Sequence, residues 1–180
     1  MAASTGGIDA LRTVLRALPE QFPAAILLVQ HTASDDGRAL CEILAAACPL
    51  PVVDAEPRQP VVPGCVYVAP PGYHLLVEPG PRLALSVDEK VCHVRPSANV
   101  LFSSAADVWR DALIGVVLTG ANEDGVEGLA AIRSRQGLGI VQKPEQAEMS
   151  EMPRAALERA GADHVLPLAE IGPLLARLCV

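Results

Sequence analysis

Three side chains that together could cleave an acyl bond lie at separate points of the chain, namely Ser4, His31 and Asp124. A serine hydroxyl becomes a good nucleophile when a base takes its proton, and histidine is the usual base. A carboxylate fixes the tautomer of that histidine and stabilises the imidazolium. Each residue also has a purely structural interpretation, as a helix cap, a hydrogen-bonded polar group at a strand end, or a turn residue. Where the predicted helices and strands place these residues therefore decides between the catalytic and the structural interpretation.

Ser4 precedes a predicted amphipathic helix. Ser4 and Thr5 occupy candidate N-cap positions, and Gly6 and Gly7 allow the backbone to turn tightly beside them. Apolar residues at helical spacing predict a helix from about Ile8 to just before Pro19. The start of such a helix directs free N–H groups and the positive end of its dipole at the hydroxyl, which suits a reaction that forms an oxyanion.

His31 and Asp124 follow two predicted buried strands. The apolar run 24–29 ends just before His31, and the run 114–118 leads into the loop that contains Asp124. Ser4 should lie in the loop after a first strand. Because functional groups gather at the carboxyl ends of strands in an open parallel sheet, we expect these three side chains to converge.

The remaining pattern predicts one α/β domain over residues 1–180. We expect a three-layer sandwich on a mostly parallel, doubly wound sheet, with a small antiparallel β insertion. Short β-rich pieces separated by Pro and Gly predict that insertion within residues 51–87. Further strands are expected near 139–141 and 164–166. Further helices are expected after a cap at Ser34-Asp35-Asp36, from Pro96-Ser97, after the loop at 119–125, from Pro153, and over 169–178.

Composition limits the classes of partner. The 180 residues are 51% hydrophobic and 19% charged and carry a net charge of −7, which argues against a nucleic-acid partner. Apolar runs are too short for a membrane span and no signal peptide precedes the first motif, so we expect a cytoplasmic protein that is not inserted in a membrane. Five scattered cysteines predict reduced thiols. The four histidines show no zinc-motif spacing, so neither a metal nor a cofactor is expected.

Several motifs, in order along nearly the whole chain, resemble the catalytic domain of the chemotaxis receptor methylesterases, the CheB family. The matching stretches are Ala3-Ser4-Thr5-Gly6-Gly7, Gln30-His31, residues 62–70 with His74-Leu75, residues 95–102, Leu118-Thr119-Gly120 with Asp124-Gly125, Met152-Pro153, and residues 165–168. The order Ser, His, Asp also differs from the Ser, Asp, His order of α/β-hydrolases.

This resemblance implies a serine hydrolase that removes methyl esters from glutamate side chains of chemoreceptors, with glutamine deamidation as a further activity. Ser4 would be the nucleophile, His31 the general base and Asp124 the orienting acid. The backbone N–H groups of Thr5 and Ala121 would bind the oxyanion. The implied partners are methylated cytoplasmic helices of a receptor and a separate receiver domain or response regulator, since no receiver domain is found in these residues.

The sequence also departs from the family pattern. Only Met1-Ala2 stands where the family has a hydrophobic strand, so either the start of the sequence is clipped or Ser4 hangs from an unsupported terminus. Further differences from the family pattern lie in the loop after His31, at Asn99, Ala121 and Glu123, and in residues 142–144. Two alternatives therefore stay open: a non-catalytic chemotaxis-like interaction module, and a serine esterase that acts on an unrelated small ester.

Overall fold

A seven-stranded parallel sheet forms the centre of the molecule in a computed structural model, which describes residues 1–32 and 37–179. The strand order is β3-β4-β2-β1-β7-β8-β9, and a separate antiparallel hairpin, β5-β6, packs beside it. The predicted α/β fold with a small antiparallel insertion is confirmed. The strands are β1 (Ala2–Ala3), β2 (Ile26–Gln30), β3 (Val52–Asp54), β4 (Val66–Val68), β5 (His74–Glu78), β6 (Arg82–Ser86), β7 (Ile114–Val117), β8 (Leu138–Gln142) and β9 (His164–Leu166).

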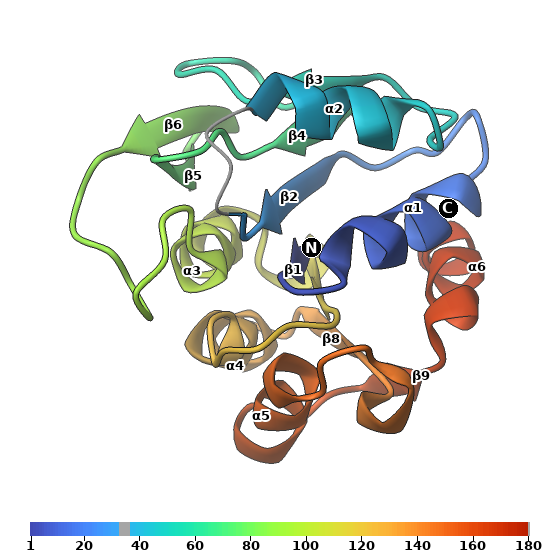
Figure 1. Cartoon of the computed structure of the whole chain (residues 1–180). Helices are drawn as coiled ribbons and strands as arrows, with labels where there is room; N and C mark the ends of the chain where they lie inside the picture. The colour runs from blue at the N-terminus through green and yellow to red at the C-terminus, as the bar shows by residue number, and fades with distance from the viewer. Residues whose placement is uncertain (33–36, 180) are drawn as a thin grey trace.

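Helices cover both faces of the sheet, which makes three layers (Figure 1). One core cluster joins the sheet to α1, α2 and α6, and the other joins it to α3, α4, α5 and the hairpin. The described residues also include two short 3-10 turns, at Arg110–Ala112 and Pro144–Gln146. The helices are α1 (Gly7–Arg16), α2 (Gly37–Ala45), α3 (Ala98–Trp109), α4 (Val126–Ser134), α5 (Glu151–Arg159) and α6 (Leu168–Leu178).

The central strand, β1, lies where the strand order reverses: the strands that follow it in sequence are first added on one side of β1 and then on the other. β1 pairs with β2 on one side and with β7 on the other, and all three run parallel. From β1 the chain first builds β2, β3 and β4, and it returns to the other side of β1 only with β7. In open α/β sheets such a switch point leaves a crevice at the carboxyl ends of the strands. The residues that follow β1, β2 and β7 therefore share one edge.

The expectation of an antiparallel arrangement throughout residues 51–87 is wrong for its first half. β3 and β4 pair in parallel with each other, and β4 pairs in parallel with β2. Only β5 and β6 form the predicted hairpin. Short β pieces bounded by Pro and Gly look alike in a sequence, whereas burial of all three β4 residues marks an interior strand.

The amino terminus is better supported than we expected. Ala2 and Ala3 are fully buried, and Val29 and Leu118 donate backbone hydrogen bonds to Met1 and Ala2, respectively. The Met1 ammonium donates to the Leu27 carbonyl oxygen over 2.7 Å. Two residues are enough to hold Ser4 because neighbouring strands bond to them from both sides.

Most predicted helix positions are confirmed to within a few residues, but the cap of the first helix is not. The N-cap of α1 is Gly6 in the left-handed region (φ 73°), and no side chain caps this helix. Ser4 and Thr5 are thereby left outside the helix. The predicted cap at 34–36 lies outside the described residues. Within the described ranges, no helix is long and apolar enough to cross a membrane.

Candidate active site

The register of the central strands places Ser4 beside His31. Ala3 pairs with Gln30, and the His31 N–H donates to the Ala3 carbonyl oxygen over 3.0 Å. Ser4 and His31 are the next residues along two neighbouring parallel strands, which lie about 4.8 Å apart. The predicted nucleophile and base therefore leave the sheet side by side.

Several hydrogen bonds hold the backbone around Ser4. The Ser4 N–H donates to the Thr119 carbonyl oxygen over 2.9 Å, and the Thr119 hydroxyl donates to the Thr5 carbonyl oxygen over 2.9 Å. On the other side, the Gln30 amide donates to the carbonyl oxygens of Ser4 (2.8 Å) and His31 (2.7 Å). Gln30 and Thr119 are buried and tie the three strand ends together.

Asp124 is fully buried and accepts hydrogen bonds with both carboxylate oxygens. Its donors are the Ser97 hydroxyl (2.7 Å), the Ala98 N–H (2.5 Å), the Asn99 N–H (3.1 Å) and His31 Nε2 (2.8 Å). Burial alone would raise the pKa of Asp124, but the hydrogen bonds from His31, Ser97 and Ala98 outweigh it and lower this pKa. The carboxyl group is therefore ionised where His31 needs an acceptor.

The first turn of α3 is part of this carboxylate site. Ser97 is the N-cap of α3, so the free N–H groups and the positive end of the helix dipole point at Asp124. Asn99, in the same turn, accepts from the N–H groups of Gly125 and Gly128, both over 2.9 Å. The side chain of Asn99 thus locks α3 to the loop that carries Asp124.

The hydrogen bonds of His31 assign its tautomer. An ionised carboxylate only accepts, so Nε2 of His31 carries the proton that is donated to Asp124. In the neutral ring Nδ1 is then the acceptor, and the Asn122 amide donates to it over 3.0 Å. Asn122 Oδ1 accepts from the Asp124 N–H over 3.0 Å, which fixes which end of the amide faces His31. Asn122 therefore covers the ring atom that would receive a proton from Ser4.

The two predicted oxyanion donors remain open. In the described part of the chain, the N–H groups of Thr5 and Ala121 donate to no other group, and both residues are exposed. Both follow strands that meet at the same edge, since Thr5 comes after β1 and Ala121 after β7. Two free N–H groups near one hydroxyl can bind a developing negative charge.

The structure thus brings the predicted residues to one sheet edge and adds others that sequence reasoning missed. Ser97 was predicted only as a helix start and Asn99 was noted only as a departure, while Asn122, Gln30 and Thr119 had no assigned role. Among the described residues, no hydrogen bond joins the Ser4 hydroxyl to His31. An Asn or Gln near the end of a predicted element was the signal that could have pointed to these residues. The sequence does not show which group such an amide hydrogen-bonds.

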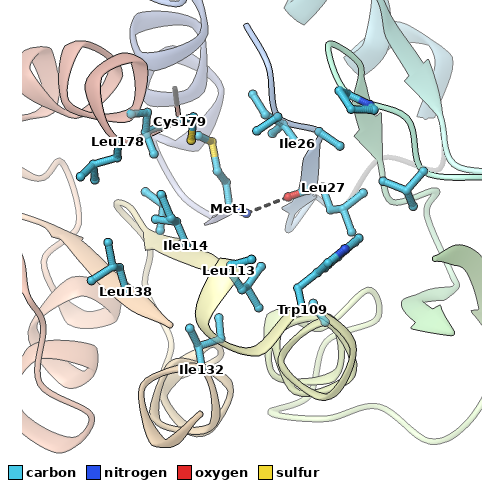
Figure 2. A pocket seen from close by; sticks show the side chains of 18 of the residues that line it. Met1, Ile26, Leu27, Trp109, Leu113, Ile114, Ile132, Leu138, Leu178 and Cys179 are labelled. Carbon is cyan, nitrogen blue, oxygen red and sulfur yellow. Dashed lines mark hydrogen bonds between the residues drawn. The ribbon is translucent and has the colours of Figure 1, made fainter. Parts of the chain in front are cut away.

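Two hollows in the described residues are lined by other side chains than Ser4, His31 and Asp124, and Figure 2 shows the larger one, around Met1 and Trp109. Within the same residues, no group of three or more His, Cys, Asp or Glu side chains is arranged to hold a metal ion. The candidate site is formed by side chains that follow the carboxyl ends of β1, β2 and β7.

Comparison with known proteins points to one family. The sequence model of the CheB methylesterase family matches residues 1–175. A putative protein-glutamate methylesterase/protein-glutamine glutaminase of Leptospira interrogans is 44% identical over 178 residues, which cover 99% of this chain and 92% of that protein. The crystal structure of the Thermotoga maritima CheB methylesterase catalytic domain superposes with a TM-score of 0.95 and 33% identity, covering 98% of this chain and 95% of that one.

Longer relatives match over about half of their length. The protein-glutamate methylesterase/protein-glutamine glutaminase of Symbiobacterium thermophilum is 37% identical over 98% of this chain and 49% of its own length. The protein-glutamate methylesterase FrzG of Myxococcus xanthus is 41% identical over 97% of this chain and 52% of its own length. The similarity therefore covers essentially the whole chain in each case.

Proposed function

Because this chain belongs to the CheB methylesterase family, we propose that it hydrolyses γ-methyl esters of glutamate side chains, with Ser4 as nucleophile, His31 as general base and Asp124 as the acid that orients it. The observation that carries this proposal is the register of β1 and β2, which sets Ser4 beside a histidine bonded to a buried carboxylate. We extend the proposal to hydrolysis of glutamine amides at equivalent positions.

In the proposed reaction, His31 Nδ1 takes the proton of Ser4 while the Ser4 oxygen attacks the ester carbonyl carbon. The tetrahedral intermediate collapses as the protonated His31 returns that proton to the methoxy group, and methanol leaves. Water activated by His31 then cleaves the γ-glutamyl ester on Ser4 and regenerates the free hydroxyl. Asp124 stays ionised throughout and stabilises the imidazolium.

The oxyanion of each intermediate would be bound by the N–H groups of Thr5 and Ala121. Both groups are available, and the amino terminus of α1 adds a positive field beside them. A backbone donor does not depend on its own side chain, so Ala121 can serve in this role.

The proposed substrate is a methylated helical segment in the cytoplasmic part of a chemoreceptor. The relatives named as acting on protein glutamate support a side chain of a protein as substrate over an unrelated small ester. A separate receiver domain or response regulator as a partner, and action in the cytoplasm, belong to the same proposal.

The proposal can be tested with receptor that carries labelled methyl groups. We expect the wild-type chain to release labelled methanol and the Ser4→Ala variant to release none above background. Ser134→Ala is a matched control, because Ser134 lies exposed at the end of α4 and only bonds the Ala131 carbonyl oxygen. Asp124→Asn should lower kcat by roughly three to four orders of magnitude, since the amide favours the wrong tautomer of His31.

Other outcomes would favour the alternatives. Equal release by the wild type and Ser4→Ala would remove Ser4 from the mechanism. If the wild type is folded by circular dichroism but releases no methanol, the non-catalytic interaction module is favoured. Turnover of small p-nitrophenyl esters without turnover of the receptor would favour an esterase for unrelated substrates.

A further inference from the structure

A second buried histidine lies behind the carboxylate of the candidate triad. His74 is the first residue of β5, and only 1% of its surface is exposed. The Ser97 N–H donates to His74 Nδ1 over 3.1 Å, and His74 Nε2 lies 3.0 Å from the Glu89 carbonyl oxygen. Both ring nitrogens of His74 therefore bond backbone groups, and one of these groups belongs to the residue that caps α3 beside Asp124.

The two partners of His74 assign its proton. A backbone N–H only donates, so Nδ1 of His74 carries no proton and accepts from Ser97. A carbonyl oxygen only accepts, so Nε2 carries the proton and donates it to Glu89. A neutral imidazole in this one tautomer satisfies both backbone groups. His74 thus holds two backbone positions at a fixed separation.

The hydrogen bond at Nδ1 orients the peptide group in front of α3. The N–H of Ser97 belongs to the planar peptide group that precedes this residue, so a bond to His74 fixes the plane of that group. Ser97 is extended (φ −115°, ψ 135°), and α3 begins directly after it. The plane therefore sets where the Ser97 hydroxyl and the N–H groups of Ala98 and Asn99 point. All three groups donate to Asp124.

The hydrogen bond at Nε2 anchors the segment that leads into α3. Three successive carbonyl oxygens in residues 87–89 accept from side chains, the first two from Arg95 Nη1 (2.6 and 2.7 Å) and the third from His74. Further along β5, the Val77 N–H donates to Ser104 Oγ on α3 over 3.1 Å. β5 is therefore joined to α3 at two separate points, which gives His74 a fixed base.

We infer that His74 is a positioning residue of the proposed triad, which acts through Ser97 by keeping the first turn of α3 on the Asp124 carboxylate. This inference rests on the role of Asp124 in the proposed function. Without the acceptor at Nδ1, the buried Ser97 N–H loses its partner and the turn shifts to find another. Asp124 is then held less firmly against His31, and the imidazolium is less stabilised.

Two uncharged amides test the two ring nitrogens of His74 separately. The side-chain oxygen of Asn lies near the position of Nδ1, so His74→Asn can still accept from Ser97. The terminal amide of Gln lies near the position of Nε2, so His74→Gln can still donate to Glu89 but leaves the Ser97 N–H without its acceptor. We expect His74→Gln to lower kcat for ester hydrolysis by roughly tenfold to a hundredfold, the effect of a displacement near 1 Å, and His74→Asn by at most about threefold. KM should change by less than about twofold in both variants, since neither loses a contact with the substrate.

Thermal unfolding separates this role from a general loss of stability. Each variant loses one of the two buried hydrogen bonds, so the two should have a similar Tm. His164→Gln, at the first residue of β9, is the control for the exchange of a histidine and should keep full kcat. Equal kcat for His74→Asn and His74→Gln, or kcat that simply follows Tm, would overturn the inference.

An NMR signal tests the inference without turnover. The proton that His31 Nε2 donates to Asp124 lies on a side chain that is only 7% exposed, and its signal can be assigned by its loss in His31→Ala. In His74→Gln the signal should move upfield, because the hydrogen bond lengthens when Asp124 is held less firmly. It should stay in place in His74→Asn and His164→Gln.

The outcomes distinguish this inference from the proposed function. A wild-type chain that releases no methanol contradicts the proposed function, while the His31 signal still decides whether His74 positions Asp124. An unchanged signal in His74→Gln would overturn the inference. If His74→Gln does not fold, wild-type kcat in His74→Asn together with an upfield shift in Ser97→Ala supports the inference, and a low kcat in a folded His74→Asn overturns it.

Discussion

At the scale of single residues, the two ring nitrogens of His31 contact two different neighbours. Asp124 accepts from Nε2 and so makes Nδ1 the basic atom, while Asn122 donates to that same Nδ1. A base whose lone pair is already occupied has to break one hydrogen bond before it can take a proton. Asn122 must therefore move away from His31 before the proposed first step.

Replacing Asn122 by Ala should consequently raise kcat for ester hydrolysis. The lost hydrogen bond is worth about 0.5–1.5 kcal/mol, which corresponds to a gain of roughly twofold to tenfold. Glu123→Ala is the control, because the side chain of Glu123 only pairs with Arg159 on the surface. The measurement is kcat at saturating substrate for both variants. A lower kcat for Asn122→Ala would show instead that Asn122 holds His31 in its working orientation.

At the scale of elements, three loops meet around one glycine. Gly120 follows β7, its N–H donates to the Met149 carbonyl oxygen and its own carbonyl oxygen accepts from the Met152 N–H. A Cβ atom at Gly120 would lie 2.5 Å from Met152 Sδ and 2.9 Å from Ser4 Cβ. The absence of a side chain at this position lets the loop after β7 approach the loop that carries Ser4.

Gly120→Ala should therefore displace Ser4 and lower kcat by about tenfold to a hundredfold, since shifts near 1 Å cost that much in catalysis. The protein should stay folded, because the flexible end of Met152 can move. Met152→Ala in the same chain should not restore activity if the contact with Ser4 is the cause. Gly139→Ala, in β8 and close to the flexible Arg133 side chain, is the control and should keep full kcat. Unchanged kcat for Gly120→Ala would refute this account of the loop packing.

At the scale of the whole molecule, the chain places a titratable amine at the centre of its main sheet. Burial of the Met1 amine lowers its pKa from 8.0 to about 5. Between these values the unfolded chain binds a proton that the folded chain excludes. The free energy of unfolding should therefore fall as the pH drops from about 8 to about 5. Above pH 8 the amine is neutral in both states and adds no pH dependence.

The expected loss is on the order of 1.4 kcal/mol per pH unit within that window. Urea unfolding of the chain at pH 8, 7 and 6 measures it, with an N-terminally acetylated form as the matched control. Acetylation removes the amine and leaves every other titratable group in place, including Asp111 and Cys179, which line the hollow around Met1. Its pH dependence should be flatter by about that amount. Parallel curves for the two forms would contradict the buried amine as the cause.

Local sequence patterns predicted most of the helices and strands and singled out the residues of the candidate triad. The runs before His31 and after Leu113 are short and wholly apolar, a pattern that predicts buried parallel strands whatever their neighbours are. Because such strands place their following loops at one edge, the convergence of Ser4, His31 and Asp124 could be predicted before any contact was known. A strand and a loop are local properties, and residue types report them.

Tertiary structure alone decided the contacts that connect these loops. The side chains of Asn99, Asn122 and Gln30 find partners 26 to 91 residues away in the sequence, and many different partners could satisfy an amide in an isolated sequence. It also decided the role of Ala2 and Ala3, which carry almost no pattern of their own. Ala2 and Ala3 form a strand because β2 and β7 bind them from both sides, and that pairing exists only in the folded chain.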